Sequence, residues 1–435
     1  MSLIGRLVAD ARTAVRVVRN ALRSRRLRNT AKAAALVDST RDLTGLRIGV
    51  YFADTRVNLY QMRQWYGPLA ELAATHPVVI IARSPGSYLT LRDEAPVPVV
   101  YLRGVTDIER FLETQELRLV LYVNQNQKNF QMFRYGRMWH VFVNHGESDK
   151  MYMTSNQFKA YDYALVAGDA ALDRLSRKLW AYDVAAKAIP IGRPQADHFA
   201  GVAPYPPDDR VTVLYAPTWE GDRPAAAYGS IASHGRALAG AVLDSSRHRL
   251  IYRPHPRSGV LSPDYRQAHL EIVAAIEAAN AKDPSAHHVY DDKPQLGWQL
   301  AAADVAITDI SAMIYDRLAT GKPILVARPV SPDAEVDEEG FLGAVDWVLA
   351  EQASGILGLV DRALTDPAAV AKLVEWSTRY FGDTTPGAAT ARFHAAIERL
   401  SAEWETHAAL HAGDRRVSES DPLDDEDEEG MPAAE

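Results

Sequence analysis

Two short polar stretches in the second half of the chain carry side chains suited to binding phosphate. One reads Arg253-Pro254-His255-Pro256 and the other Thr308-Asp309-Ile310-Ser311. Each follows an apolar run that predicts a buried strand, so the polar residues fall where a strand ends. In open parallel sheets, ligands bind beyond the carboxyl ends of the strands, where helix N-termini offer N–H groups to anions. We therefore predict a site for a diphosphate group at these two strand ends.

The first stretch combines a planar cation with a restrained imidazole. The guanidinium of Arg253 can donate two parallel hydrogen bonds to phosphate oxygens. The prolines on both sides of His255 restrict its backbone, as expected for a group that must keep a fixed geometry. Pro217-Thr218 follows another apolar run and adds a hydroxyl, although such a pair is often only a turn.

The second stretch reads as a strand end followed by the start of a helix. Thr308, Asp309 and Ser311 are typical helix N-cap residues, Ala312 follows them, and the helix itself is predicted at residues 310–318. The N–H groups there suit phosphate, but plain capping is the alternative. Asp316 lies too far along for its side chain to share one spot with Ser311 on an ideal helix.

A third strand end, at residues 141–144, leads into His145-Gly146-Glu147. Histidine suits general-base catalysis because its unperturbed pKa of about 6.5 lies near the operating pH. Gly146 lets a ligand approach the backbone, and Glu147 or Asp149 could orient the imidazole. The alternative is a structural histidine followed by residues that cap a helix.

Apolar, β-branched runs alternate with amphipathic stretches along most of the chain, which predicts parallel sheets covered by helices. The α/β pattern stops at the proline-rich residues 194–209 and then restarts. Two doubly wound Rossmann-like domains facing across a cleft match the GT-B architecture of nucleotide-sugar transferases. Residues 58–75 are expected to form one helix, and residues 388–400 the last helix. The predicted parts are a basic amphipathic helical segment at 1–40, an acceptor-side domain at 45–205, a nucleotide-donor domain at 210–403 and a disordered acidic tail at 414–435.

Composition excludes several kinds of site. The chain has 435 residues and no cysteine, which rules out disulfides, thiolate zinc sites and a cysteine nucleophile. No histidine–carboxylate motif predicts a bound metal. The 47% hydrophobic and 24% charged residues are typical of a soluble globular protein.

The two ends of the chain carry opposite charge. Residues 1–35 hold nine basic side chains against Asp10 alone, with apolar residues at helical spacing. Arginines interrupt every apolar run, so the segment is too polar to span a bilayer but suits an anionic membrane surface. The alternative is packing on its own domain or on a partner. Nucleic acid is not expected, because the helix lacks interleaved aromatics and the whole chain has a net charge of −8.

The motifs, in their order along the chain, resemble the CDP-glycerol glycerophosphotransferase family of teichoic acid biosynthesis. They are His145-Gly146, Ala216-Pro217-Thr218, Arg253-x-His255-Pro256 and Ile307-Thr308-Asp309-x-Ser311. The resemblance implies a GT-B fold without a cofactor, on the inner membrane face. It implies transfer of glycerol phosphate from CDP-glycerol to a lipid-linked glycopolymer, with release of CMP.

The resemblance also implies roles for single residues. His145 would deprotonate the acceptor hydroxyl, and His255 would stabilise or protonate the departing phosphate. The residues predicted to bind substrate are Gly146, Glu147, Pro217, Thr218, Arg253, Thr308, Asp309, Ser311, Ala312 and Asp316.

Three departures from the family pattern leave the donor and acceptor open. Glu147 and Asp149 add carboxylates after His145-Gly146, and Ala312 stands where a second serine is usual. An expected arginine falls on Gln195, with Arg193 nearby. The alternatives are a glycosyltransferase that uses a nucleotide sugar, or a non-catalytic relative that binds a nucleotide or polymer. The sequence also leaves open whether the chain forms a homo-oligomer.

Overall fold

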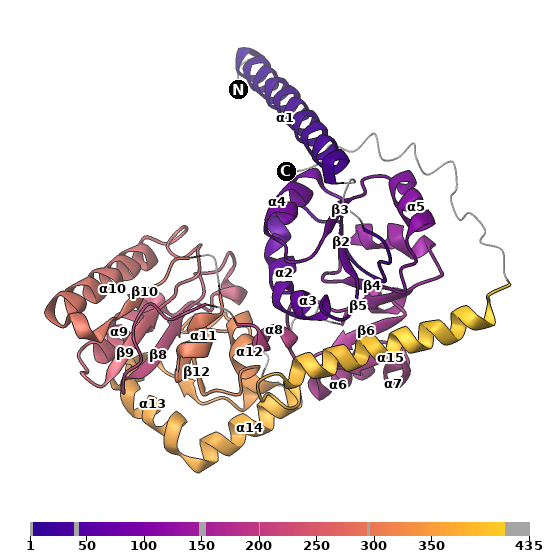
Figure 1. Cartoon of the computed structure of the whole chain (residues 1–435). Coiled ribbons are helices and arrows are strands. Elements are labelled where there is room, and N and C mark those ends of the chain that lie inside the picture. The colour runs from indigo at the N-terminus through magenta and orange to yellow at the C-terminus, as the bar shows by residue number, and fades with distance from the viewer. Residues whose placement is uncertain are drawn as a thin grey trace.

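The chain forms two α/β domains that lie side by side (Figure 1). The computed structural model describes residues 3–38, 43–147, 154–199, 201–293, 296–336, 338 and 340–413, with backbone alone for residues 3–18 and 20. Each domain is built on one parallel sheet flanked by helices, which confirms the predicted GT-B-like fold class.

The first domain contains, within the described residues, a seven-stranded sheet in the order β3-β2-β1-β4-β5-β6-β7. The central strands consist of apolar residues that are buried along their whole length, as expected when helices cover both faces. The strands are β1 Ile48–Phe52, β2 Val78–Ala82, β3 Val99–Tyr101, β4 Leu119–Tyr122, β5 Trp139–Phe142, β6 Tyr163–Val166 and β7 Ala188–Pro190. The helices are α2 Leu59–Arg63, α3 Tyr66–Leu72, α4 Pro85–Glu94, α5 Val105–Thr114, α6 Asp169–Lys178, α7 Val184–Lys187 and α8 Pro194–Asp197.

The second domain contains, in the part of the chain that is described, a six-stranded sheet in the order β10-β9-β8-β11-β12-β13. Its strands are β8 Val211–Ala216, β9 His248–Tyr252, β10 Val289–Tyr290, β11 Val305–Thr308, β12 Ile324–Ala327 and β13 Trp347–Val348. Its helices are α9 Arg236–Leu243, α10 Pro263–Lys282, α11 Trp298–Ala302, α12 Ala312–Leu318, α13 Ile356–Thr365 and α14 Pro367–Phe381, and a π-helical turn, η6 Ile231–Gly235, precedes α9.

The strand order reverses once in each sheet. β1 pairs with both β2 and β4, and β8 pairs with both β9 and β11. The loops after such neighbouring strands turn to opposite faces and leave a crevice in which ligands of α/β proteins bind. The polar motifs after β8, β9 and β11 therefore lie beside one crevice of the second domain.

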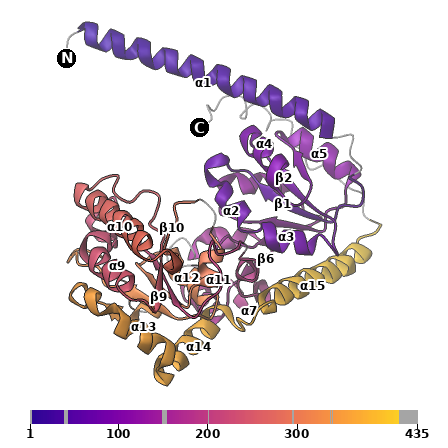
Figure 2. The same ribbon diagram turned by 60° about the vertical axis from the view of Figure 1, so that its left-hand side comes forward.

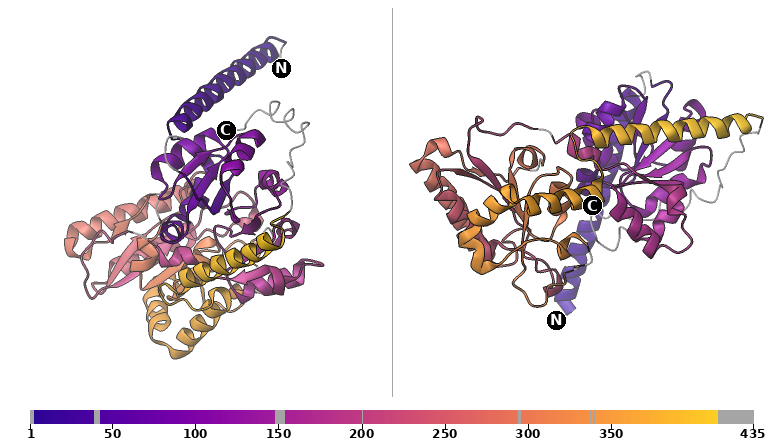
Figure 3. Two further views of the ribbon diagram at one scale, coloured as in Figure 1. Left: turned by 45° about the vertical axis from the view of Figure 1, so that its right-hand side comes forward. Right: turned by 90° about the horizontal axis from the view of Figure 1, so that it is seen from below.

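The last helix, α15 Ala388–Leu410, belongs by its packing to the first domain, although the sequence placed residues 388–403 in the second. Phe393, Ile397 and Leu400 are buried in the same cluster as strands β1, β2 and β4. The Phe393 ring lies 5.3 Å from that of Trp65. Figures 1 and 3 show α15 running along the first domain after α14 has left the second. The chain thus crosses between the domains twice.

The prediction of a single helix at residues 58–75 is wrong. The segment forms two helices, α2 and α3, with a break at Gln64 and Trp65. Pro68 explains the break, because a proline inside a helix has no N–H to donate to the carbonyl four residues earlier, which here is that of Gln64.

The predicted N-terminal helix is present as α1 Leu3–Asp38. Its C-terminal end is fixed by Asp38, whose carboxylate accepts from Tyr88 Oη and Arg92 Nε, each at 2.6 Å. Ala31 is buried against the first domain, while the N-terminal part of the helix projects away from it (Figure 2). The acidic tail predicted at 414–435 lies outside the described residues.

The docking of α15 can be tested by stability. Phe393→Ala removes a fully buried ring and should lower the free energy of unfolding by about 3–5 kcal/mol, because a cavity forms beside Trp65. Urea denaturation followed by circular dichroism measures this change. Val374→Ala on α14, whose side chain is 57% exposed, is the control and should change it by less than about 0.5 kcal/mol. An equally small effect of Phe393→Ala would show that α15 is not packed on the first domain in solution.

Candidate functional site

Asp309, at the end of β11, lies inside the second domain. Its side chain is 0% exposed, and its Oδ2 accepts from the backbone N–H groups of Thr218 at 2.7 Å and Ser230 at 3.0 Å. Burial raises the pKa of Asp309 to about 7, although these hydrogen bonds favour the carboxylate. The structure thus places Asp309 beneath the loop that follows β8, where it holds the backbone of that loop. Thr308 is equally buried.

Ser311 caps helix α12, as its residue type predicts. Its Oγ accepts from the backbone N–H of Met313 at 3.3 Å. Ala312, the first helical residue, is exposed, and Ser311 is half-buried. Ser311 and Ala312 are therefore the members of this motif that face solvent beside the crevice.

The guanidinium of Arg253 has a partner that the sequence did not predict. It forms an ion pair with Asp291, a buried residue that also accepts from Gln299. The Arg253 side chain is only 15% exposed, and Asp291 already balances its charge. A ligand there would contact a salt bridge rather than an isolated cation.

His255 lies on the surface of the second domain, next to the loop after β8. Its backbone N–H donates to the carbonyl of Pro217 at 3.0 Å, and its Nδ1 accepts from the backbone N–H of Arg257 at 3.1 Å. Because a backbone N–H can only donate, Nδ1 carries no proton, and the proton of the neutral ring sits on Nε2. Partial burial and then the charge of Arg257 lower the pKa of His255. Its exposed nitrogen is thus a hydrogen-bond donor.

His145 has the opposite tautomer. Its Nδ1 lies 3.0 Å from the carbonyl oxygen of Val123, which follows β4. A carbonyl can only accept, so Nδ1 carries the proton and Nε2 keeps its lone pair. Burial and then the charge of Arg193 lower the pKa of His145 to about 4. The neutral ring therefore presents a proton acceptor, and the Tyr60 ring lies nearly perpendicular to it, with 5.9 Å between the ring centroids.

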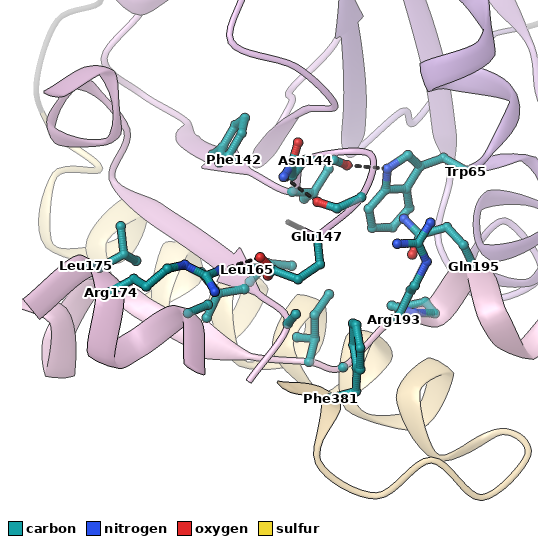
Figure 4. Close-up of a pocket in the computed structure, with 18 of the residues that line it drawn as sticks. Trp65, Phe142, Asn144, Glu147, Leu165, Arg174, Leu175, Arg193, Gln195 and Phe381 are labelled. Atoms are coloured by element: carbon teal, nitrogen blue, oxygen red, sulfur yellow. Dashed lines mark hydrogen bonds and ion pairs between the residues drawn. The ribbon is translucent and has the colours of Figure 1, made fainter. Parts of the chain in front are cut away.

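A strained turn presents His145. Asn144 has a φ of 55°, a conformation in which asparagine is favoured among residues with a side chain. The Asn144 side-chain amide donates to the carbonyl of Gly146 at 2.5 Å, and Trp65 Nε1 donates to the backbone carbonyl of Asn144 at 2.5 Å (Figure 4). These contacts hold the loop after β5 in one shape.

Glu147 does not orient His145, contrary to one of the hypotheses drawn from the sequence. It is 6% exposed and forms an ion pair with Arg174 in the wall of a cavity that Gly146 also lines, and Figure 4 shows the pair. The carbonyl of Val123 orients the imidazole instead. Asp149, the other residue considered for this role, lies outside the described residues.

Arg193 connects the two domains. It follows β7 of the first domain, and its Nη2 lies 2.5 Å from Asp316 Oδ1 on α12 of the second. Gln64 accepts from the same nitrogen at 3.3 Å. Burial raises the pKa of Asp316 even though Arg193 pulls it down. The sequence predicts no role for Arg193. The only local signal is its position in the Gly192-Arg193-Pro194 turn, and that signal does not reveal Asp316 as its partner.

Contacts link the predicted site residues across both domains. The charge of Arg193 acts on His145, and Arg193 binds Asp316 on the helix that Ser311 caps. Asp309, just before that helix, binds the backbone of Thr218, and Pro217 binds that of His255. These contacts form a path from His145 in the first domain to His255 in the second.

Two kinds of feature are absent from the described part of the chain. Its histidines and carboxylates form no cluster of three or more that could hold a metal ion. Within the same residues, no helix is long and apolar enough to cross a membrane.

Residues 139–335 match the sequence model of the CDP-glycerol:poly(glycerophosphate) glycerophosphotransferase family, an enzyme family. This confirms, for the stretch that holds all four motifs, the resemblance on which the sequence analysis relied. No curated protein is significantly similar to the chain.

Solved structures share the fold. The wall teichoic acid polymerase TagF is similar over 91% of this chain and 98% of that chain, with 13% identity and a TM-score of 0.53. A putative UDP-N-acetylglucosamine 2-epimerase from Listeria monocytogenes is similar over 83% and 98%, with 16% identity and a TM-score of 0.55. At such identities the likeness shows the fold alone.

The state of His145 can be measured directly. In a protein labelled at histidine Cε1, the His145 resonance, assigned by its loss in His145→Gln, should show a neutral ring at pH 7. Because burial opposes the charged form, the ring should gain its proton only as the pH falls through about 4. A midpoint near the ordinary 6.5 would contradict the buried, carbonyl-bound ring.

Proposed function

We propose that this member of the CDP-glycerol:poly(glycerophosphate) glycerophosphotransferase family moves glycerol phosphate, or a related polyol phosphate, from a CDP-activated donor to an acceptor hydroxyl on a membrane- or polymer-linked glycopolymer. The reaction releases CMP and belongs to cell-wall polymer synthesis. Support comes from the family match over residues 139–335. The observation that carries the proposal is the pair of opposite tautomers at His145 and His255.

His145 is the candidate base because its Nε2 lone pair is free at neutral pH, although a pKa lowered to about 4 makes it a weaker base than an ordinary imidazole. The lone pair on Nε2 takes the proton of the acceptor hydroxyl while the acceptor oxygen attacks the phosphorus that bears glycerol. The bridging P–O bond breaks as the new O–P bond forms, and CMP leaves. General-base assistance of this kind is worth about 10²–10⁴-fold in rate.

His255 is suited to the leaving group. Its Nε2–H donates to an oxygen of the departing CMP phosphate, where negative charge develops in the transition state. The exposed start of α12 at Ser311 and Ala312, together with Thr218, holds the diphosphate from the other side. Arg253 and Gly146 complete the proposed donor site.

Buried ion pairs reduce the repulsion that carboxylates would exert on an anionic donor. Glu147 is paired with Arg174, Asp316 with Arg193, and Asp291 with Arg253. Each pair is close to neutral as a unit, so no uncompensated carboxylate of these three faces the donor. We propose that Glu147 and Asp316 shape the site through their arginines, while Asp309 and Pro217 shape it through the backbone.

We further propose that the enzyme works in the cytoplasm, peripherally on the inner face of the cell membrane, bound through α1. On the part of this helix that projects from the domain, Arg19, Arg23, Arg25 and Arg26 are exposed beside Leu22, which is 53% exposed. Arginine side chains flanking aliphatic ones suit an anionic lipid surface. Such attachment would bring the site to a lipid-linked acceptor.

The catalytic assignment is tested by CMP release. Purified protein is incubated with the acceptor polymer and, in turn, with CDP-glycerol, CDP-ribitol and common nucleotide sugars. His145→Ala and His255→Ala should each lower turnover by about 10²-fold or more with unchanged circular dichroism, because the first removes the base and the second removes the hydrogen-bond donor to the leaving phosphate. His287→Asn, at an exposed left-handed residue that tolerates asparagine, is the control and should keep full activity.

Near-normal CMP release by either alanine variant would remove that histidine from the mechanism. Release of a nucleoside diphosphate from a nucleotide sugar would instead favour the glycosyltransferase alternative. Nucleotide binding without turnover on any donor would favour a non-catalytic relative.

Membrane attachment is tested by removing residues 1–24. The truncation leaves Ala31 and Asp38, which fix α1 to the domain, but deletes five arginines. Binding to phosphatidylglycerol vesicles should weaken by at least about tenfold, since each basic residue near an anionic surface contributes about 1 kcal/mol. Phosphatidylcholine vesicles serve as the control and should bind neither protein. Unchanged binding to the anionic vesicles would rule out residues 1–24 of α1 as the attachment.

A further inference from the structure

The carboxylate of Asp309 joins the two ends of one loop. The loop runs from Thr218, just after β8, to Ser230, just before η6. Both ends donate their backbone N–H groups to the same oxygen, Oδ2, at 2.7 and 3.0 Å. The Ser230 side chain is held in turn by Tyr215, with 2.7 Å between the two hydroxyl oxygens. The buried carboxylate therefore fixes where the loop leaves and re-enters the domain.

This loop carries two side chains that determine the surroundings of His255. The ring of Trp219 stacks on the His255 imidazole, with centroids 6.4 Å apart and planes 29° apart. The carboxylate of Glu220 accepts from the backbone N–H groups of Gly259, Leu261 and Ser262, at 2.9 to 3.0 Å. Those amides belong to the loop that follows His255, so the loop after β8 holds the loop after β9.

The same loops fix the tautomer of His255. Arg257, whose backbone N–H binds Nδ1, lies with its guanidinium carbon 3.7 Å from the centre of the Trp219 ring. Moving Trp219 would therefore move Arg257, and with it the hydrogen bond that places the proton on Nε2.

Asp309 does not reach a ligand itself. Its side chain is 0% exposed, and its second oxygen, Oδ1, has no hydrogen-bond partner among the described residues. The ionisable groups that act on it are the phenols of Tyr215, Tyr252 and Tyr265, which are all uncharged near neutral pH. No cation among the described residues offsets the burial of this carboxyl, so its role must lie in the backbone groups it binds.

We propose that Asp309 is a positioning residue for His255, acting through the loop between Thr218 and Ser230. Its part in turnover depends on the proposed function, whereas its effect on the His255 ring does not. In this assignment Asp309 binds no substrate, although the family resemblance placed it among the substrate-binding residues.

The experiment compares Asp309→Ala with Asp309→Asn. The amide keeps an oxygen that can accept from both N–H groups, whereas alanine keeps none. Val360→Ala is the matched control, because Val360 is fully buried in the core of the same domain, on α13. Three properties are measured: hydrogen exchange at residues 218–230 and 259–262, the pKa of His255 by NMR, and kcat with KM for the CDP-activated donor.

Asp309→Ala should speed exchange in both segments by at least about tenfold, because the carboxylate that joins them is gone. The pKa of His255 should rise toward 6.5, and kcat should fall by at least about tenfold with KM changed by less than about threefold. Asp309→Asn should restore the exchange rates and the pKa of His255 most of the way. Val360→Ala should lower the melting temperature and leave the three properties at their wild-type values.

Unchanged exchange at residues 259–262 and an unchanged His255 pKa in Asp309→Ala would overturn the proposal, whatever happens to turnover. Equal effects in Val360→Ala would also overturn it, because they would reflect general destabilisation. Exchange and pKa are measured without donor or acceptor. If the wild type turns over no CDP-activated donor, the proposed function fails while these two measurements still decide the role of Asp309.

Discussion

The ion pair between Arg193 and Asp316 is the contact on which the candidate site depends. The chain crosses between the domains after α8 and again before α15, and this pair joins them next to the strand ends. Both residues are 6% exposed, so each charge is stable there only because the other is present. Breaking such a pair by removing one partner typically costs about 3–5 kcal/mol. The pair therefore favours one placement of the His145 loop relative to the helix that Ser311 caps.

The backbone groups next to His145 and His255 give the two imidazole rings different tautomers. A carbonyl that binds Nδ1 of His145 leaves a lone pair on Nε2, and an amide N–H that binds Nδ1 of His255 leaves a proton on Nε2. The proposed transfer needs a base where the acceptor hydroxyl loses its proton and a hydrogen-bond donor where the leaving phosphate gains charge. Neither ring needs a neighbouring carboxylate for this, and both stay neutral at physiological pH because burial lowers their pKa values.

The carboxylates near the site serve its architecture. Glu147, Asp291 and Asp316 are each bound to an arginine, and Asp309 and Glu220 are bound to backbone N–H groups. An anionic donor is repelled by an unpaired carboxylate but much less by one whose charge is already compensated. The same bonds order the loops after β8, β9 and β11. Carboxylates that would repel an anionic donor if they were unpaired therefore stiffen the site instead.

The sequence by itself determined the α/β class, the positions of most strands and the order of the motifs. Runs such as residues 78–82 and 324–327 form strands because local apolar patterning decides burial in a parallel sheet. The four motifs were visible because strand ends follow directly from those runs. Only the tertiary structure decided which partner each polar side chain meets, as for Arg253 with Asp291 and Arg193 with Asp316. It also decided that α15 covers the first domain, because such contacts join residues that are far apart in the chain and have no local signature.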